Sequence, residues 1–141
     1  MGRLLAIDYG RKRCGIAVTD PLRIVATALA TVPAADLQRF VADYVAREQV
    51  DAIIVGRPLT LRGEPSESVR WLAPAIGRLR KALPEMKFVE WDERFTSTLA
   101  HRAMIDGGYR RHDRQNKDAI DRMAAVIILN SYLDSLGPGG I

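Results

Sequence analysis

Acidic residues fall at positions where their carboxylates could meet around a metal ion. Asp8 follows the apolar residues of "LLAIDYG" and so belongs to a strand that otherwise looks buried. A buried carboxylate needs a cation, hydrogen-bond donors or a metal, because leaving it unpaired is costly. Asp92 and Glu93 lie at the end of a second apolar strand, and Asp118 and Asp121 are three residues apart on one face of a helical segment. If both segments flank the first strand, the acids converge.

Several carboxylates in one place repel each other, and a divalent ion with hard oxygen ligands, Mg²⁺ or Mn²⁺, relieves that repulsion. Two such ions about 4 Å apart can activate a water and stabilise the leaving oxygen in phosphodiester cleavage. Neighbouring strand residues point to opposite faces, so only one of Asp92 and Glu93 can face the site directly. We take Glu93 as the first choice and Asp92 as the second. The pattern therefore predicts a metal-dependent nuclease.

Each remaining acid also has a structural interpretation. Asp8 could pair with a neighbouring arginine, since structural ion pairs also occupy such positions. Asp118 lies close to the start of its helix, where the helix dipole favours a negative charge in any case. Asp121 lies deeper in the helix and is followed by Ala124 and Ala125, whose small side chains would let the helix approach the sheet. For Asp121 we favour a functional role.

Basic residues cluster near these acids. The net charge is only +4, but local clusters of cations favour a polyanionic partner such as nucleic acid. Charge-rich loops are also common as plain solvated surface, and the sequence leaves both interpretations open. The two histidines show no metal-ligand spacing. The candidate phosphate contacts are Arg11, Lys12, Arg13, Arg57, Arg62, Arg110, Arg111, Arg114 and Lys117.

Composition is that of an ordinary globular chain, with 141 residues, 48% hydrophobic and 27% charged. We expect one domain over residues 1–136 and a frayed tail over 137–141. The longest apolar run, Met123–Leu129, is far shorter than the roughly 20 residues of a membrane span. No secretory signal pattern is visible, and the single Cys14 fits a reducing compartment. The expected location is the cytoplasm.

The acids must be positioned by alternating strands and helices. Apolar periodicity and turn residues predict three antiparallel strands, then helices alternating with two further strands. This order predicts an α/β fold, a mixed five-stranded sheet with helices on both faces, and a ligand site at the carboxyl ends of the central strands. The expected strands are Leu4–Tyr9, Gly15–Thr19, Ile24–Val32, Asp51–Pro58 and Lys87–Phe95, and the expected helices are Ala35–Glu48, one that starts near Ser66 and contains Pro74, a short one at Thr96–Gly108, and Lys117–Leu136.

Four motifs together carry a family resemblance over nearly the whole chain. "AIDYGRKRCGIAVTD", "VGRPLTLRGEPSE", "DERFTS" and "KDAIDRMAAVIIL" occur in this order. In this respect the chain resembles the YqgF-type family of pre-16S rRNA nucleases, also described as Holliday-junction resolvase-like proteins. The resemblance implies a ribonuclease-H-like fold and a metal-dependent nuclease that processes the 5′ end of 16S ribosomal RNA. By matching motif it assigns the catalytic acids to Asp8, Glu93 and Asp121.

Other functions remain open at this stage. Resolution of four-way DNA junctions uses the same chemistry, and two symmetric cuts normally need a dimer, so the chain could be a monomer or a homodimer. The segment "DYGRKRCGIAV" also resembles the phosphate-binding hairpin of sugar kinases and actin-type ATPases, which ATP binding would test. A non-catalytic RNA-binding module would explain the basic clusters but not the three acids.

Overall fold

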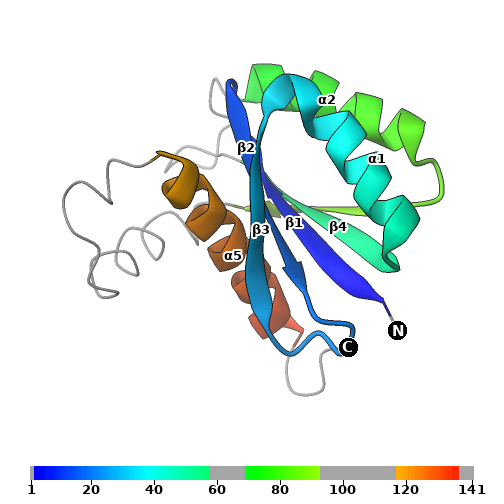
Figure 1. Ribbon diagram of the computed structural model, residues 1–141, viewed down its shortest axis with the longest axis vertical. Coiled ribbons are helices and arrows are strands. Elements are labelled where there is room, and N and C mark those ends of the chain that lie inside the picture. Colours follow the sequence, from blue (N-terminus) through cyan, green and yellow to red (C-terminus); the bar gives the residue numbers. More distant parts are fainter. Residues whose placement is uncertain (1, 58–68, 93–116, 137–141) are drawn as a thin grey trace.

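A mixed five-stranded sheet forms the centre of the molecule, with helices on both faces (Figure 1). The computed structural model describes residues 2–57, 69–92 and 117–136. No helix in these ranges is long and apolar enough to cross a bilayer. In chain order the elements are β1 (Arg3–Asp8), β2 (Arg13–Thr19), β3 (Ala26–Pro33), a 3₁₀ turn (Ala34–Asp36), α1 (Leu37–Arg47), β4 (Val50–Arg57), α2 (Val69–Ala82), β5 (Lys87–Asp92) and α5 (Lys117–Ser135).

The strand order β3-β2-β1-β4-β5 confirms the predicted mixed sheet. β1, β2 and β3 pair antiparallel, as their short connections predict, while β4 lies parallel to both β1 and β5. The nearly continuous apolar run of β4 fits this interior position, since parallel strands covered by helices are buried on both faces. β3 begins at Ala26, two residues later than expected, and a 3₁₀ turn precedes α1. Pro74 lies inside α2.

Two apolar clusters cover the two faces of the sheet. Side chains of β1 alternate between them: Leu5 and Ile7 belong to the cluster under α1 and α2, and Leu4 and Ala6 belong to the cluster under α5. Figure 1 shows α1 and α2 on one side of the sheet and α5 on the other. The strands contribute three alanines to the cluster under α5, Ala6, Ala17 and Ala52, and this long helix packs against β1, β2 and β3.

Some expectations lie outside the described residues. These are the cap at Ser66, the continuation of β5 beyond Asp92, the short helix at Thr96–Gly108 and the frayed tail at 137–141.

Candidate active site at the carboxyl edge of the sheet

Three predicted site residues are the last residues of three adjacent parallel strands. Asp8 is the last residue of β1, Arg57 of β4 and Asp92 of β5. The register pairs Ile7 with Val55, and Arg57 with Asp92, so the three strands end at one edge of the sheet. Carboxyl ends of parallel strands are where sheets of this kind place ligands. The strand order therefore places these positions along one edge of the sheet, with β4 between β1 and β5.

Asp8 lies on the α5 face of this edge. It continues the alternation of Leu4 and Ala6, which pack in the cluster under α5, and it is half-buried. Its cross-strand neighbour on β2 is Gly15. Directly paired residues project to the same face, and a glycine there has no side chain to cover the carboxylate. Asp8 is thus held in a partly enclosed position with no β2 side chain over it on this face.

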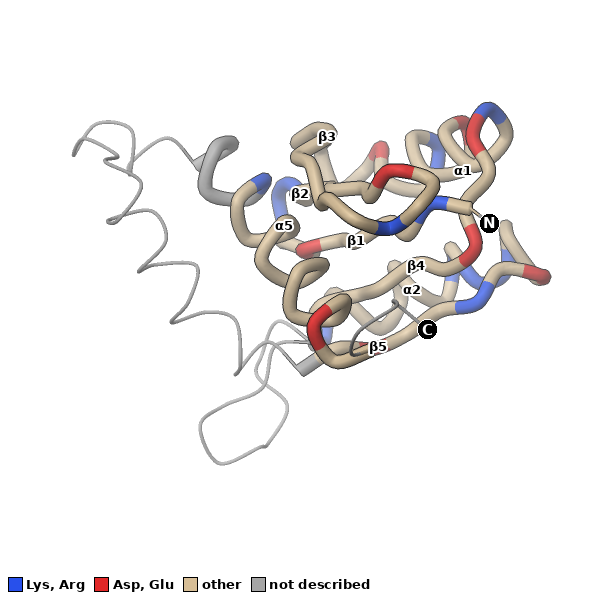
Figure 2. Tube along the Cα trace, turned by 90° about the horizontal axis from the view of Figure 1, so that it is seen from below, with Lys and Arg blue, Asp and Glu red and all other residues tan. Residues whose placement is uncertain are grey.

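The first turns of α5 lie at the same level of the sheet. Arg122 donates a hydrogen bond from Nη1 to Oγ1 of Thr31 at 3.3 Å. Thr31 pairs with Gly15, and Gly15 pairs with Asp8, so the three residues form one row across β3, β2 and β1. Figure 2 shows α5 beside β1 and β2. The contact of Arg122 fixes the beginning of α5 to the row that contains Asp8.

Asp118 and Asp121 belong by their backbone to these first turns of α5. Asp121 precedes Arg122 directly and is four residues before Ala125, which is fully buried against the sheet. Residues four apart lie on the same face of a helix. The helix therefore brings the backbone position of Asp121 toward the Asp8 row, while the side chains of both acids lie outside the described part of the structure.

The connection between β1 and β2 leads from the site toward α2. Tyr9 packs against the cluster under α1 and α2, and burial raises the pKa of its phenol, a shift that the charge of Arg78 on α2 opposes. Lys12 is held through its carbonyl, which accepts a hydrogen bond from the N–H of Ala34, directly after β3, at 2.9 Å. A Cβ at Gly10 would collide with the carbonyl oxygen of Arg13. The turn itself therefore requires a glycine at this position.

The basic residues of this connection differ in exposure. Arg11 and Lys12 are exposed, and Arg13 is half-buried at the start of β2. The guanidinium carbon of Arg11 lies 4.3 Å from the centroid of the Trp71 ring on α2. Our sequence interpretation did not include Trp71. A signal was present, because Trp71 falls outside the apolar helical phase that Leu72 belongs to, and an off-phase tryptophan is expected at the surface.

Several predicted residues cannot be placed. Within the ranges that the structure describes, no three His, Cys, Asp or Glu side chains gather in one group. The side chains of Arg57, Asp92 and Lys117 are not described although their backbones are. The predicted site residues that lie outside the described ranges altogether are Arg62, Glu93, Arg110, Arg111 and Arg114.

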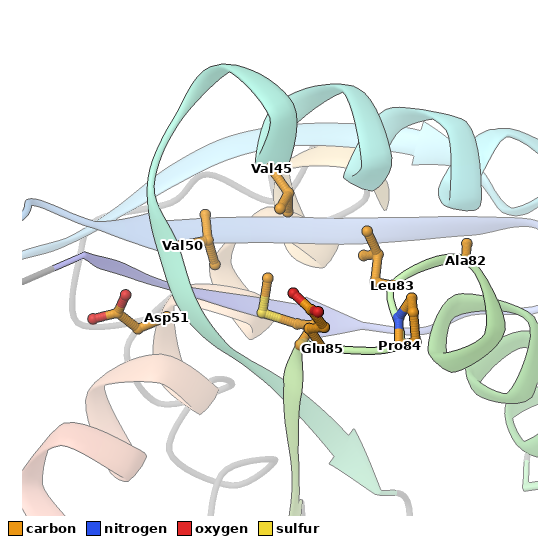
Figure 3. Close-up of a pocket in the computed structure, with 8 residues that line it drawn as sticks. Val45, Val50, Asp51, Ala82, Leu83, Pro84 and Glu85 are labelled. Atoms are coloured by element: carbon orange, nitrogen blue, oxygen red, sulfur yellow. The ribbon is translucent and has the colours of Figure 1, made fainter.

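A separate cleft of about 480 Å³ lies at the opposite, amino edge of the sheet. Figure 3 shows its lining, which is mostly apolar and includes the acids Asp51 and Glu85. Asp51 is already engaged, since its Oδ2 accepts hydrogen bonds from the Gly2 N–H at 2.8 Å and from Arg23 at 2.6 Å. These contacts lower the pKa of Asp51, the Gly2 bond most of all. This acid anchors the chain start and has no evident chemical role.

Comparisons with known proteins match nearly the whole chain. The family model RuvX, described as Holliday junction resolvase, matches residues 2–135. A protein of Phocaeicola vulgatus with the name "Putative pre-16S rRNA nuclease" is 51% identical and covers 96% of this chain and 97% of its own length. A protein of Bacteroides thetaiotaomicron with the same name is 48% identical over 96% of this chain and 98% of its own.

The fold is also shared with a solved structure. Thermus thermophilus RuvC, in complex with a Holliday junction substrate, superposes with a TM-score of 0.61 at 15% identity, over 97% of both chains. The same protein in another structure gives a TM-score of 0.55 at 14% identity, over 96% of both chains. These similarities confirm the predicted ribonuclease-H-like fold.

Proposed function

Because the chain belongs to the RuvX family of Holliday junction resolvases, we propose that it is a nuclease that hydrolyses phosphodiester bonds with the help of a divalent metal ion. One observation carries the proposal. Half-buried Asp8 ends the central strand on the face where α5 begins, in the row of Asp8, Gly15 and Thr31 to which Arg122 of α5 is hydrogen-bonded. The names of the relatives point to pre-16S rRNA as the substrate, and we propose processing of its 5′ end as the reaction. The family description favours cleavage of four-way DNA as the alternative.

Asp8, Glu93 and Asp121 are the proposed ligands and catalytic acids. Val89 and Trp91 contribute to the cluster under α5, and Glu93 is next in that alternation if the strand geometry continues. Carboxylate oxygens are the ligands that Mg²⁺ and Mn²⁺ prefer, so the donor set fits the ion. Asp92 and Asp118 are the secondary candidates. When bound, such an ion supplies an activated water and neutralises charge that develops on the phosphate.

The protein itself supplies position and charge. The strand end holds Asp8 in a fixed, partly enclosed place, which raises the electrostatic effect of each charge near it. Exposed Arg11 and Lys12 lie in the connection that follows Asp8 and are available to phosphates. Within the described residues, no carboxylate lies at ion-pair distance from either of them. The other proposed phosphate contacts are Arg13, Arg57, Arg62, Arg110, Arg111, Arg114 and Lys117.

A cleavage assay tests the proposal. Purified protein is incubated with precursor 16S RNA and with a four-way DNA junction, each with Mn²⁺ or with chelator. Asp8→Asn should lower cleavage by roughly a hundredfold or more, the scale of losing a group that stabilises transition-state charge. Asp43→Asn is the matched control, because Asp43 is exposed on α1. Full activity of Asp8→Asn, or undiminished cleavage in chelator, would refute the proposed site.

Thermal unfolding gives a second readout that needs no activity. A ligand that binds only the folded state stabilises by about 2.7 kcal/mol at a concentration of 100 times its Kd. Mn²⁺ should therefore raise the melting temperature of the parent and of Asp43→Asn, but much less that of Asp8→Asn or Asp121→Asn. An equal response of all four proteins would show that these acids do not hold the ion.

A further inference from the structure

Trp71 is an exposed aromatic side chain near the start of α2, on the face of the sheet opposite α5. Its side chain is 43% exposed, and within the described residues it is the one aromatic among the exposed large hydrophobics. The core-facing residues of α2 are Leu72, Ala75, Ile76 and Leu79. Trp71 lies outside that stripe, so burial does not explain a tryptophan at this position. An exposed indole offers a large rigid surface for a ligand.

Contacts tie Trp71 to the connection that leaves Asp8. Arg11 stacks on the ring, with its guanidinium carbon 4.3 Å from the ring centroid. The charge of Arg78, two turns after Trp71 on the same side of α2, acts to lower the pKa of Tyr9. The connection therefore reaches the first turns of α2. Arg11 is three residues from Asp8, which limits their Cα separation to roughly 11 Å. The pair is therefore within reach of a nucleic-acid strand cleaved at Asp8, around the carboxyl edge of the sheet.

Resting on the proposed nuclease function, we propose that Trp71 and Arg11 form a stacking platform for an unpaired base next to the cleaved phosphate. Arg11 holds the indole by stacking on it and offers its donors to a phosphate, while the indole stacks with the base. Such stacking needs a base that is free of its partner, because bases within a continuous duplex are already stacked on each other. The preferred substrate is therefore a nucleic acid with single-stranded nucleotides at the cleavage position.

Intrinsic fluorescence can report on the platform directly. The chain has two tryptophans, and the other one, Trp91, donates a hydrogen bond to Ser131 at 3.0 Å and packs edge-on against Tyr132. In a Trp91→Phe background, tryptophan emission comes from Trp71 alone. Titration in chelator, where no cleavage is expected, should show quenching by a short single-stranded oligonucleotide. The same oligonucleotide with abasic positions, and a blunt duplex, should quench much less.

Affinity measurements on the unaltered background test the same idea without Trp91→Phe. Trp71→Ala should weaken single-strand binding roughly 5- to 150-fold, the range for the loss of one base–aromatic stack, with an unchanged salt slope. Trp71→Phe should restore most of the affinity. Arg11→Ala should reduce the salt slope by about one phosphate contact. Lys81→Ala, at an exposed position at the far end of α2, is the matched control and should change neither quantity.

The outcomes separate this proposal from the nuclease assignment. If Trp71→Ala binds single strands as tightly as the parent, if duplex binds and quenches as strongly as single strand, or if no oligonucleotide binds at all, the platform is refuted. If single strands bind through Trp71 but the protein cleaves nothing with Mn²⁺, the nuclease assignment fails and the platform stands.

Discussion

Replacing Ala125 with leucine tests how closely α5 packs on the sheet beside Asp8. Ala125 is fully buried and shares its cluster with Ala6 of β1 and Ala17 of β2. These small side chains let the helix backbone approach the strands. An isobutyl group in place of the methyl has no space there unless the helix moves outward or the neighbours distort.

The expected cost follows from this packing. Inserting extra carbon atoms into a well-packed core typically costs about 1–3 kcal/mol, while the difference in helix propensity between alanine and leucine is small. A chain of 141 residues has an unfolding entropy of about 0.3 kcal/mol/K near its melting temperature. The melting temperature of Ala125→Leu should therefore fall by roughly 3–10 °C.

The same displacement should reach the proposed site. Asp121 is one turn before Ala125, and a misplacement of about 1 Å can cost roughly a hundredfold in rate. Cleavage, measured at a temperature where parent and variant are both folded, should thus fall by more than the fraction unfolded explains. Ala124→Leu is the control on the same helix, because Ala124 is only half-buried. If both leucine variants melt and cleave alike, the close packing at Ala125 does not position the site.

Two further predictions concern the turn after β1 and the start of the chain. Gly10→Ala should destabilise the protein in thermal melts, because the new Cβ would collide with a backbone carbonyl. Gly77→Ala, at an exposed helical position with open space around it, should stabilise the protein by about 0.5–1 kcal/mol. Equal shifts of the melting temperature in the two variants would contradict the turn argument. The hydrogen bond from the Gly2 N–H, and then the one from Arg23, lower the pKa of Asp51. The ionised carboxylate therefore contributes to the stability of the fold above the unfolded-state pKa of about 3.9, and this contribution is lost as the pH falls through the lower folded-state pKa. Chemical denaturation should show the parent more stable than Asp51→Asn at neutral pH, with the difference shrinking below about pH 4, and a difference independent of pH would refute this linkage.

Local pattern was sufficient for most of the secondary structure and for the sheet. Short runs of β-forming residues, separated by turn residues, specified the antiparallel meander of β1, β2 and β3, because strands joined by so few residues usually pair with each other. The continuous apolar run of β4 similarly indicated parallel pairing on both sides. Asp8 stood out for the same local reason, since an acid within an apolar strand needs a special environment.

Contacts between distant segments could not be obtained in that way. The stacking of Arg11 on Trp71 and the hydrogen bond from Arg122 to Thr31 join residues that are far apart in the chain. Each depends on the side of the sheet that a helix covers and on the level at which the helix begins. Both the covered face and the level of the helix are set by the packing of whole elements, for example where Ala125 of α5 contacts the strands. The residue types at the site were therefore determined by the sequence, and their neighbours were decided only by the tertiary structure.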